Sequence, residues 1–361
     1  MPPTASPSPQ QAAPAGRAAY LVLGMHRSGT SALAQLLSIA GADLPRNPMP
    51  GDDHNAQGYF EPWRIANFND ERLRAAGSAW DDVFAYPYPR VAPEQAPEWT
   101  RRAAALFEEE YAGRSHPLIK EPRMTVLAPF WREVLEAAGV GLRCVVPVRH
   151  PLAVARSLGR RDGFPPEKSV LLWSAYMLAA EAYSRDLPRA FVDYDLMLED
   201  WRGEVARIEH AHGAPLPRLD DGAAREIDAA LNAELRHNRA VGDLSELGWT
   251  GRLAQAVYTA LSQAARGHPA PVEALDAAAR ELADRARDCG PLVSPAARDL
   301  DQARGDLLAA RQALDWERRE HEELKARFET LHRDWLHQTE VIEAVGCTLD
   351  DILIRGGATA R

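Results

Sequence analysis

A loop framed by two glycines, Gly24-Met25-His26-Arg27-Ser28-Gly29-Thr30-Ser31, constrains the fold of this chain more than any other segment. It follows an apolar run over residues 19–23, which predicts a buried strand, and it precedes residues 32–40, whose pattern predicts a helix. In such a loop the backbone N–H groups point inward, and the dipole of the following helix favours negative charge. We therefore expect an anion-binding site at this point of the chain.

The spacing of the two glycines is that of a nucleotide-binding P-loop, but the lysine of that motif is missing. Thr30 and Ser31 follow the second glycine, where an ATP-binding loop has Lys and then Ser or Thr. The cation stands inside the loop instead, at Arg27. This shift disfavours ATP hydrolysis or phosphoryl transfer and favours another phosphate-bearing donor.

A second candidate phosphate contact lies far downstream. Residues 142–148 predict another buried strand, which ends at Arg149-His150-Pro151. Pro151 suits the first position of a helix, and Ser157 falls on the second turn of that helix. Ligands of open α/β sheets bind beyond the carboxyl ends of the strands, and an arginine fork suits a phosphate dianion. We expect Arg149 and Ser157 to hold a second phosphate group.

Together, residues 27–31 and the Arg149–Ser157 pair resemble the phosphate sites of sulfotransferases that use PAPS (3′-phosphoadenosine 5′-phosphosulfate). The sequence of the loop over residues 24–31 is similar to that of bacterial sulfotransferase-like proteins and of the tyrosylprotein and glycan branches. The resemblance covers Ala18 to about Gly242. It departs from the cytosolic branch, which has Lys where this chain has Arg27. The resemblance implies that the 3′-phosphate binds Arg149 and Ser157. It implies that the 5′-phosphosulfate binds Arg27, Ser28, Gly29, Thr30 and Ser31.

The resemblance extends to Lys120, because a lysine in a similar segment of glycan sulfotransferases lies beside the leaving phosphate. It also places Tyr194 and a basic loop over residues 236–243 near the co-substrate. The residues alone leave alternatives open. Lys120 also suits a solvated ion-pair cluster with Glu121 and Arg123, and Tyr194 also suits packing in the core.

Sulfuryl transfer needs cations beside the leaving oxygen and a base for the proton of the acceptor. Arg27 and Lys120 are the candidate cations, so no metal is required. Glu61 is the preferred base, because glycan and tyrosine sulfotransferases commonly use a glutamate in the corresponding region. His54 is the alternative base, since imidazole titrates near neutral pH. Glu61 also suits a helix-capping role before Pro62.

Composition narrows the class of protein and its setting. The net charge of −10 argues against general binding to nucleic acid. The three cysteines are scattered, without disulfide or metal spacing, which indicates a reducing compartment. No apolar stretch of about twenty residues predicts a membrane span, and residues 1–17 lack the apolar core of a secretion signal. We expect a cytoplasmic enzyme of bacterial type.

Apolar strand candidates at 19–24, 117–121, 142–149 and 189–194 alternate with helical patterns. This alternation predicts an α/β fold, with a P-loop-type parallel sheet flanked by helices. We expect a disordered segment over 1–17, a sulfotransferase-like α/β domain with a helical C-terminal part over 18–295, a coiled-coil helix over 296–345 and a tail over 346–361.

A heptad pattern supports the coiled-coil helix. Glu317, His321 and Gln338 interrupt its apolar seam, so we expect the middle to be weaker. The alternative is one long helix folded back onto the catalytic domain. We expect self-association (a homo-oligomer) or docking of a partner through residues 296–345. One seam position holds Leu300, Leu307, Leu314, His321, Phe328, Trp335 and Ile342, and the other holds Ala303, Ala310, Glu317, Leu324, Leu331 and Gln338.

The resemblance implies a PAPS-dependent sulfotransferase, and its glycan branch favours a carbohydrate acceptor over a protein tyrosine or a small metabolite. Two other hypotheses remain. One is a nucleotide or small-molecule kinase on the same architecture, which the missing lysine disfavours and which magnesium dependence would reveal. The other is a non-catalytic nucleotide-binding adaptor that presents the coiled coil.

Overall fold

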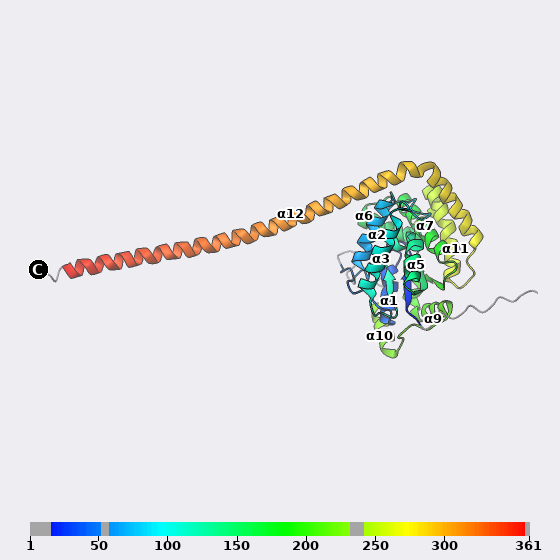
Figure 1. The fold of residues 1–361 in the computed structure, drawn as a ribbon, viewed down its shortest axis with the longest axis horizontal. Helices are drawn as coiled ribbons and strands as arrows, with labels where there is room; N and C mark the ends of the chain where they lie inside the picture. Colours follow the sequence, from blue (N-terminus) through cyan, green and yellow to red (C-terminus); the bar gives the residue numbers. More distant parts are fainter. Residues whose placement is uncertain (1–15, 52–57, 232–241, 358–361) are drawn as a thin grey trace, which may run out of the picture. The chain divides into compact units, whose positions relative to one another are not determined.

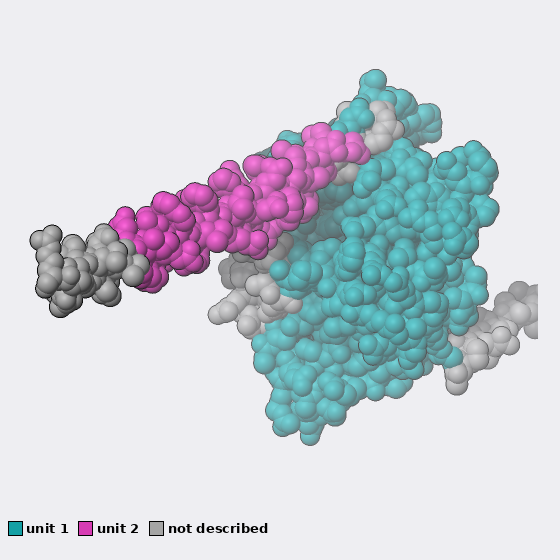
Figure 2. All heavy atoms as spheres, turned by 60° about the vertical axis from the view of Figure 1, so that its left-hand side comes forward, with its two compact units in different colours: residues 1–299 teal, residues 300–361 magenta. Residues whose placement is uncertain are grey.

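The computed structural model of the chain describes residues 16–51, 58–231 and 242–357. The chain divides into two compact units, residues 1–299 and residues 300–361 (Figure 2). In the described ranges, no helix combines the length and the apolar character that crossing a bilayer requires.

A parallel sheet of four strands forms the centre of unit 1 in the described residues. The strands are β1 (Ala18–Val22), β2 (Leu118–Lys120), β3 (Gly141–Val148) and β4 (Arg189–Asp193). Their order is β2-β1-β3-β4, so the chain leaves β1 toward one side of the sheet and leaves β3 toward the other. The boundary between β1 and β3 is therefore the switch point at which ligands of such sheets bind.

Helices fill the connections between the strands and follow the last strand (Figure 1). The expected α/β fold with a flanked parallel sheet is confirmed. The helices are α1 (Thr30–Ile39), α2 (Trp63–Ala75), α3 (Ala96–Tyr111), α4 (Arg123–Val126), α5 (Ala128–Ala137), α6 (Pro151–Asp162), α7 (Pro166–Tyr183), α8 (Tyr194–Glu199), α9 (Trp201–His212), α10 (Asp221–Ala230), the 3-10 helix η2 (Leu244–Leu247), α11 (Gly248–Ala265) and α12 (Val272–Gly357).

The sheet buries both of its faces, because successive side chains of a strand point to opposite sides. Ala19 and Leu21 of β1 belong to one apolar cluster, and Tyr20 and Val22 belong to the other. Helices α5, α6, α7 and α11 contribute to the first cluster, whereas α1, α9 and α10 contribute to the second. Unit 1 is thus layered as helices, sheet and helices around β1.

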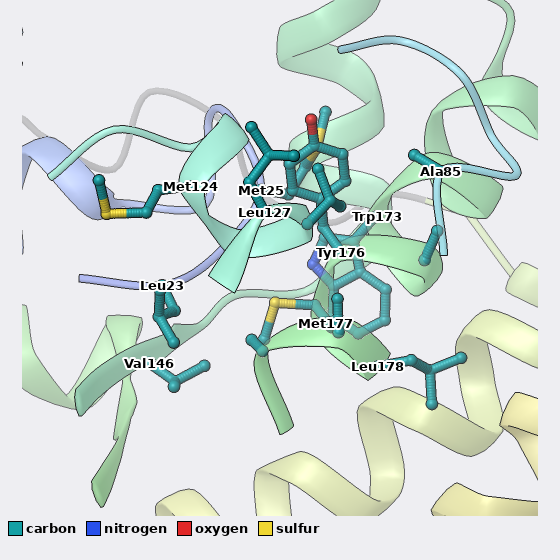
Figure 3. Close-up of a cluster of buried hydrophobic side chains, with 14 of the residues drawn as sticks. Leu23, Met25, Ala85, Met124, Leu127, Val146, Trp173, Tyr176, Met177 and Leu178 are labelled. Carbon is teal, nitrogen blue, oxygen red and sulfur yellow. The ribbon is translucent and has the colours of Figure 1, made fainter. Parts of the chain in front are cut away.

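The loop after β1 is anchored in the first of these clusters. Met25 is fully buried and belongs to the same cluster as Leu127, Trp173 and Tyr176, as Figure 3 shows. Helix α7, which carries Trp173 and Tyr176, is buried on nearly every side. An apolar side chain inside the loop therefore ties the loop to the core of unit 1.

The C-terminal helix is longer than the sequence predicts. The expected helix over 296–345 is present, but α12 begins at Val272 and continues to Gly357. Pro291 and Pro295 lie inside it, although each proline costs an intrahelical hydrogen bond. Helix α12 nevertheless continues through both prolines. The segment expected as a tail from residue 346 is helical as far as Gly357.

Candidate active site

The loop between β1 and α1 has a fixed backbone shape. Thr125 of α4 clamps its start, because its hydroxyl accepts from Gly24 N at 2.8 Å and donates to Gly24 O at 3.2 Å. Arg27 and Gly29 both have positive φ angles, 68° and 90°. Helix α1 begins directly after Gly29. The predicted strand, loop and helix are therefore present in the expected order.

The surroundings of Ser28, at the N-terminus of α1, suit an anionic ligand. Its side chain is fully buried beside the start of α1. In the part of the chain that the structure describes, its hydroxyl oxygen has no hydrogen-bond partner. Buried polar atoms are nearly always hydrogen-bonded, and a helix N-terminus attracts negative charge. A phosphate oxygen would satisfy both features.

Lys120 brings a buried cation to the loop from the neighbouring strand. It pairs with Val22 in the sheet, and only 2% of it is exposed. Its ammonium donates to Glu61 Oε1 at 2.5 Å, to Tyr59 O at 3.0 Å and to Ser31 Oγ at 3.2 Å. The structure thus joins Lys120, Glu61 and Ser31, three residues that the sequence places in the site.

The structure also shows which contacts these residues make in place of the structural roles that the sequence left open. Glu61 does not cap α2, which starts after Pro62 without a side-chain cap. Arg123 pairs with Glu121 at 2.7 Å and with Asp70, and within this cluster Glu121 is fully buried whereas Arg123 and Asp70 are half-buried. Burial raises the pKa of Glu121 to about 7, against the opposing effect of Arg123. Lys120 is not among the ion pairs of that cluster and faces Glu61 instead.

The two phosphate motifs meet at the ends of β1 and β3. Arg27 Nε donates to Ser157 Oγ at 2.8 Å, across 130 residues of sequence. Arg149 Nη1 donates to Arg27 O at 3.0 Å, and its guanidinium carbon lies 4.3 Å from the centre of the Tyr194 ring. Arg149, Ser157 and Tyr194 are all buried. The geometry therefore forms one polar cluster from residues that the sequence assigned to two phosphate groups.

Tyr194 packs between the loop and Arg149. A Cβ atom at position 29 would collide with carbons of the Tyr194 ring, so the ring lies directly against Gly29. Asp193 fixes the start of α8, because its carboxylate accepts from Asp195 N at 3.0 Å. The packing role that the sequence left open for Tyr194 is therefore present, and through it Tyr194 orients Arg149.

The site concentrates positive charge in a buried place. Burial lowers the pKa of Arg27, and the neighbouring Arg161 and Arg149 lower it further. Burial is also the main cause that lowers the pKa of Arg149. His26 has a pKa well below its usual value, because it is buried and faces Arg161 and other cations. Cations that lower one another's pKa are stabilised together by a bound anion.

Some residues that the sequence assigned to the site lie outside the described ranges. Some contacts that the structure shows were not indicated by any sequence pattern. His54, the alternative base, and residues 236–241 of the basic loop are outside the described ranges. Thr125 and the carbonyl of Tyr59 were missed, because neither a lone threonine nor a backbone oxygen forms a recognisable pattern. Among the described residues, no group of His, Cys, Asp and Glu side chains is arranged to hold a metal ion.

Comparison with known proteins finds similar solved structures but no matching family model or curated protein. The sulfotransferase domain from the curacin biosynthetic pathway is similar with a TM-score of 0.38 and 16% identity, over 68% of this chain and 98% of that chain. The sulfotransferase domain from the Synechococcus PCC 7002 olefin synthase is similar with a TM-score of 0.37 and 16% identity, over 76% of this chain and 98% of that chain.

Proposed function

We propose that this chain is a sulfotransferase that uses PAPS as its donor. The contact between Arg27 and Ser157, at 2.8 Å, is the observation that supports this most strongly. It joins two sets of phosphate-binding residues at the switch point of the sheet. A donor with a 5′-phosphosulfate and a 3′-phosphate needs two such sets in one site.

Lys120 supports sulfuryl transfer over phosphoryl transfer from ATP. In an ATP-binding P-loop, the hydroxyl at the position of Ser31 binds Mg²⁺ and the position of Thr30 carries a lysine. Here the ammonium of Lys120 lies 3.2 Å from Ser31 Oγ. A side-chain cation from β2 therefore stands beside the hydroxyl that binds the metal in ATP-dependent enzymes. This arrangement favours transfer that does not depend on Mg²⁺.

The proposed roles follow from these positions. The loop residues from Arg27 to Ser31 and the start of α1 bind the phosphosulfate, and Arg149 and Ser157 bind the 3′-phosphate. As a bond forms between the acceptor oxygen and sulfur, the bond from sulfur to the phosphate oxygen breaks. Arg27 and Lys120 stabilise the charge on the leaving phosphate. Glu61 takes the proton of the acceptor, and Lys120 links this base to the donor side of the site.

We propose a carbohydrate hydroxyl as the acceptor. Trp63, two residues after Glu61, has 41% of its surface exposed, although large aromatic side chains are usually more buried. Its ring lies under the guanidinium of Arg64, 5.5 Å from the ring centre. An exposed aromatic ring two residues after the proposed base in the sequence suits stacking against a sugar. A saccharide panel with Trp63→Ala tests this, and we expect a raised KM for the acceptor.

Calorimetric titration with PAP, the desulfated product, and separately with ATP and Mg²⁺ tests the donor. We expect metal-independent PAP binding that Arg27→Ala and Arg149→Ala each weaken by about tenfold to a hundredfold, since each removes charged hydrogen bonds. Arg287→Ala is the matched control, because Arg287 is exposed and pairs only with Asp284 among the ion pairs of the described residues.

The alternatives predict other results. A preference for ATP with Mg²⁺ would favour a kinase. PAP binding without transfer to any saccharide, tyrosine peptide or small alcohol would favour a nucleotide-binding adaptor.

A further inference from the structure

Unit 2 exposes an apolar stripe along residues 300–345, which Glu317, His321 and Gln338 interrupt. Residues 300–345 lie in a single helix, and the apolar side chains of one seam range from 45% exposed at Leu300 to 70% exposed at Ile342. Helices gain most of their stability by packing an apolar face, and large exposed apolar stripes mark interaction surfaces. The stripe therefore needs a packing partner, and the charges beside it identify that partner.

The charges that flank the seam are sorted by sign. In heptad notation Leu300 and Leu307 occupy position a, so the flanking positions are e and g. Every e position in the first four heptads is basic, while the g positions from 299 to 320 are acidic with one alanine. The e residues are Arg304, Arg311, Arg318 and Lys325, and the g residues are Asp299, Asp306, Ala313 and Glu320.

We propose that two copies of this chain pair through residues 300–345 as a parallel, in-register, two-stranded coiled coil. In a parallel coil each g residue faces the e residue of the next heptad on the other helix. Asp306 of one copy then faces Arg311 of the second copy, and Glu320 faces Lys325. The same pattern begins with Asp299 and Arg304. Opposite charges therefore meet along the first half of the coil.

An antiparallel pair would bring like charges together. In that arrangement e positions face e positions and g positions face g positions. With residues 300–345 fully overlapped, Arg318 would meet Lys325, and Asp306 and Arg311 would lose the opposite charges that they face in the parallel pair. Like charges at these positions are destabilising. The pattern thus selects both the occupant of the seam, a second copy, and its direction. This inference is independent of the proposed sulfotransferase activity.

The two halves of the coil contribute differently. In the second half the g-to-e pairs are Arg327 with His332 and Asp334 with Thr339, which add little attraction. That half instead carries the largest seam residues, Phe328 and Trp335 among them. We infer that the first half sets direction and register, whereas the second half supplies most of the buried apolar area.

A cysteine cross-link tests the direction and register. In the full chain with Cys289→Ser and Cys347→Ser, Leu307→Cys places one thiol in the seam. The remaining native cysteine, Cys144, is buried and has its pKa raised to about 12, so it will not react. In a parallel, in-register coil the two thiols at position 307 are adjacent, and oxidation will link the chains. Gln312→Cys, on the outer face, is the matched control and will remain unlinked.

Charge reversal tests the specificity of pairing. The double variant Arg311→Glu/Lys325→Glu and the double variant Asp306→Arg/Glu320→Lys should each self-associate at least about tenfold more weakly than the wild type. An equimolar mixture of the two should restore association as a heterodimer. Circular dichroism and urea unfolding of each variant confirm that the chain is folded.

Sedimentation equilibrium of the full chain gives the number of copies. We expect twice the mass of one chain. A monomer at all concentrations, a trimer, an absent cross-link at position 307, or association that ignores charge reversal would each overturn the proposal.

Discussion

Gly29 shows how one residue shapes the loop. Its φ of 90° disfavours any residue with a Cβ, and the Tyr194 ring occupies the place of that Cβ. We predict that Gly29→Ala lowers the free energy of unfolding by more than the roughly 1–2 kcal/mol that a left-handed φ alone costs, and that it abolishes PAP binding. Gly113→Ala separates the two effects, because Gly113 has a φ of 75° but no atom near its absent Cβ. Urea unfolding measures the free energy of unfolding of both variants. Equal losses of stability in Gly29→Ala and Gly113→Ala would show that the Tyr194 contact is unimportant.

The proposed role of Glu61 as the base can be tested by a single substitution. We predict that Glu61→Gln lowers turnover by about 10²- to 10⁴-fold while PAP still binds, because the amide cannot accept the proton of the acceptor. Glu181→Gln is the control, since Glu181 is also buried and ion-paired, with Arg185 and Arg189. Turnover is compared with binding measured calorimetrically on the same preparations.

A fully active Glu61→Gln variant would instead make Glu61 a structural partner of Lys120. The base would then have to be sought elsewhere, with His54 as the first candidate.

At the scale of elements, His212 links α9 to the sheet through a hydrogen bond. Its Nε2 donates to Cys144 O of β3 at 3.0 Å, and burial lowers its pKa from 6.5 to about 4. Between these values the folded state binds fewer protons than the unfolded state. The stability from neutral His212 is therefore complete above pH 6.5 and is lost as the pH falls toward 4, by at most about 3 kcal/mol.

Urea unfolding between pH 4 and pH 7 measures this loss. His212→Gln keeps a donor for Cys144 O but does not titrate, so its pH slope should be smaller than that of the wild type. His210→Gln, at an exposed position of the same helix, should keep the wild-type slope. A wild-type slope in both variants would mean that other groups cause the acid sensitivity.

The elements of unit 1 could be predicted because their signals are local. The apolar runs of β1 and β3, and the proline at the start of α6, each depend on residues that are neighbours in the sequence. The family resemblance placed Arg27 and Ser157 at one co-substrate but did not predict their direct contact, which joins residues 130 positions apart.

Contacts that depend on how elements meet were not predictable in this way. The pairing of Lys120 with Glu61 depends on β2 lying beside β1. The order of strands in a sheet cannot be predicted from residues that are neighbours in the sequence. The clamp of Thr125 on Gly24 needs α4 to pack against the loop. The start of α12 at Val272 was missed, because Pro295 was interpreted as a boundary rather than as a residue within the helix.

At the scale of the whole molecule, the proposed dimer makes the two units respond differently to concentration. A coil formed by two chains becomes more stable as protein concentration rises, whereas a unit that folds within one chain does not. We predict that the thermal transition of the helix over 300–345 moves to higher temperature with concentration. The transition of unit 1 should stay fixed, and circular dichroism over a hundredfold range of about 1–100 μM separates the two.

The polar interruptions of the seam provide the last test. In a parallel pair, Glu317 faces its counterpart at position d and His321 faces its counterpart at position a, so polar groups lie where the seam buries apolar ones. We predict that Glu317→Leu with His321→Leu stabilises the dimer by roughly 3 kcal/mol or more, because leucines become buried there. Arg319→Leu adds a leucine at the outer position f and should leave the dimer unchanged. Equal stabilisation by both changes would mean that the helix uses another face, and the register proposed from the charges would be wrong.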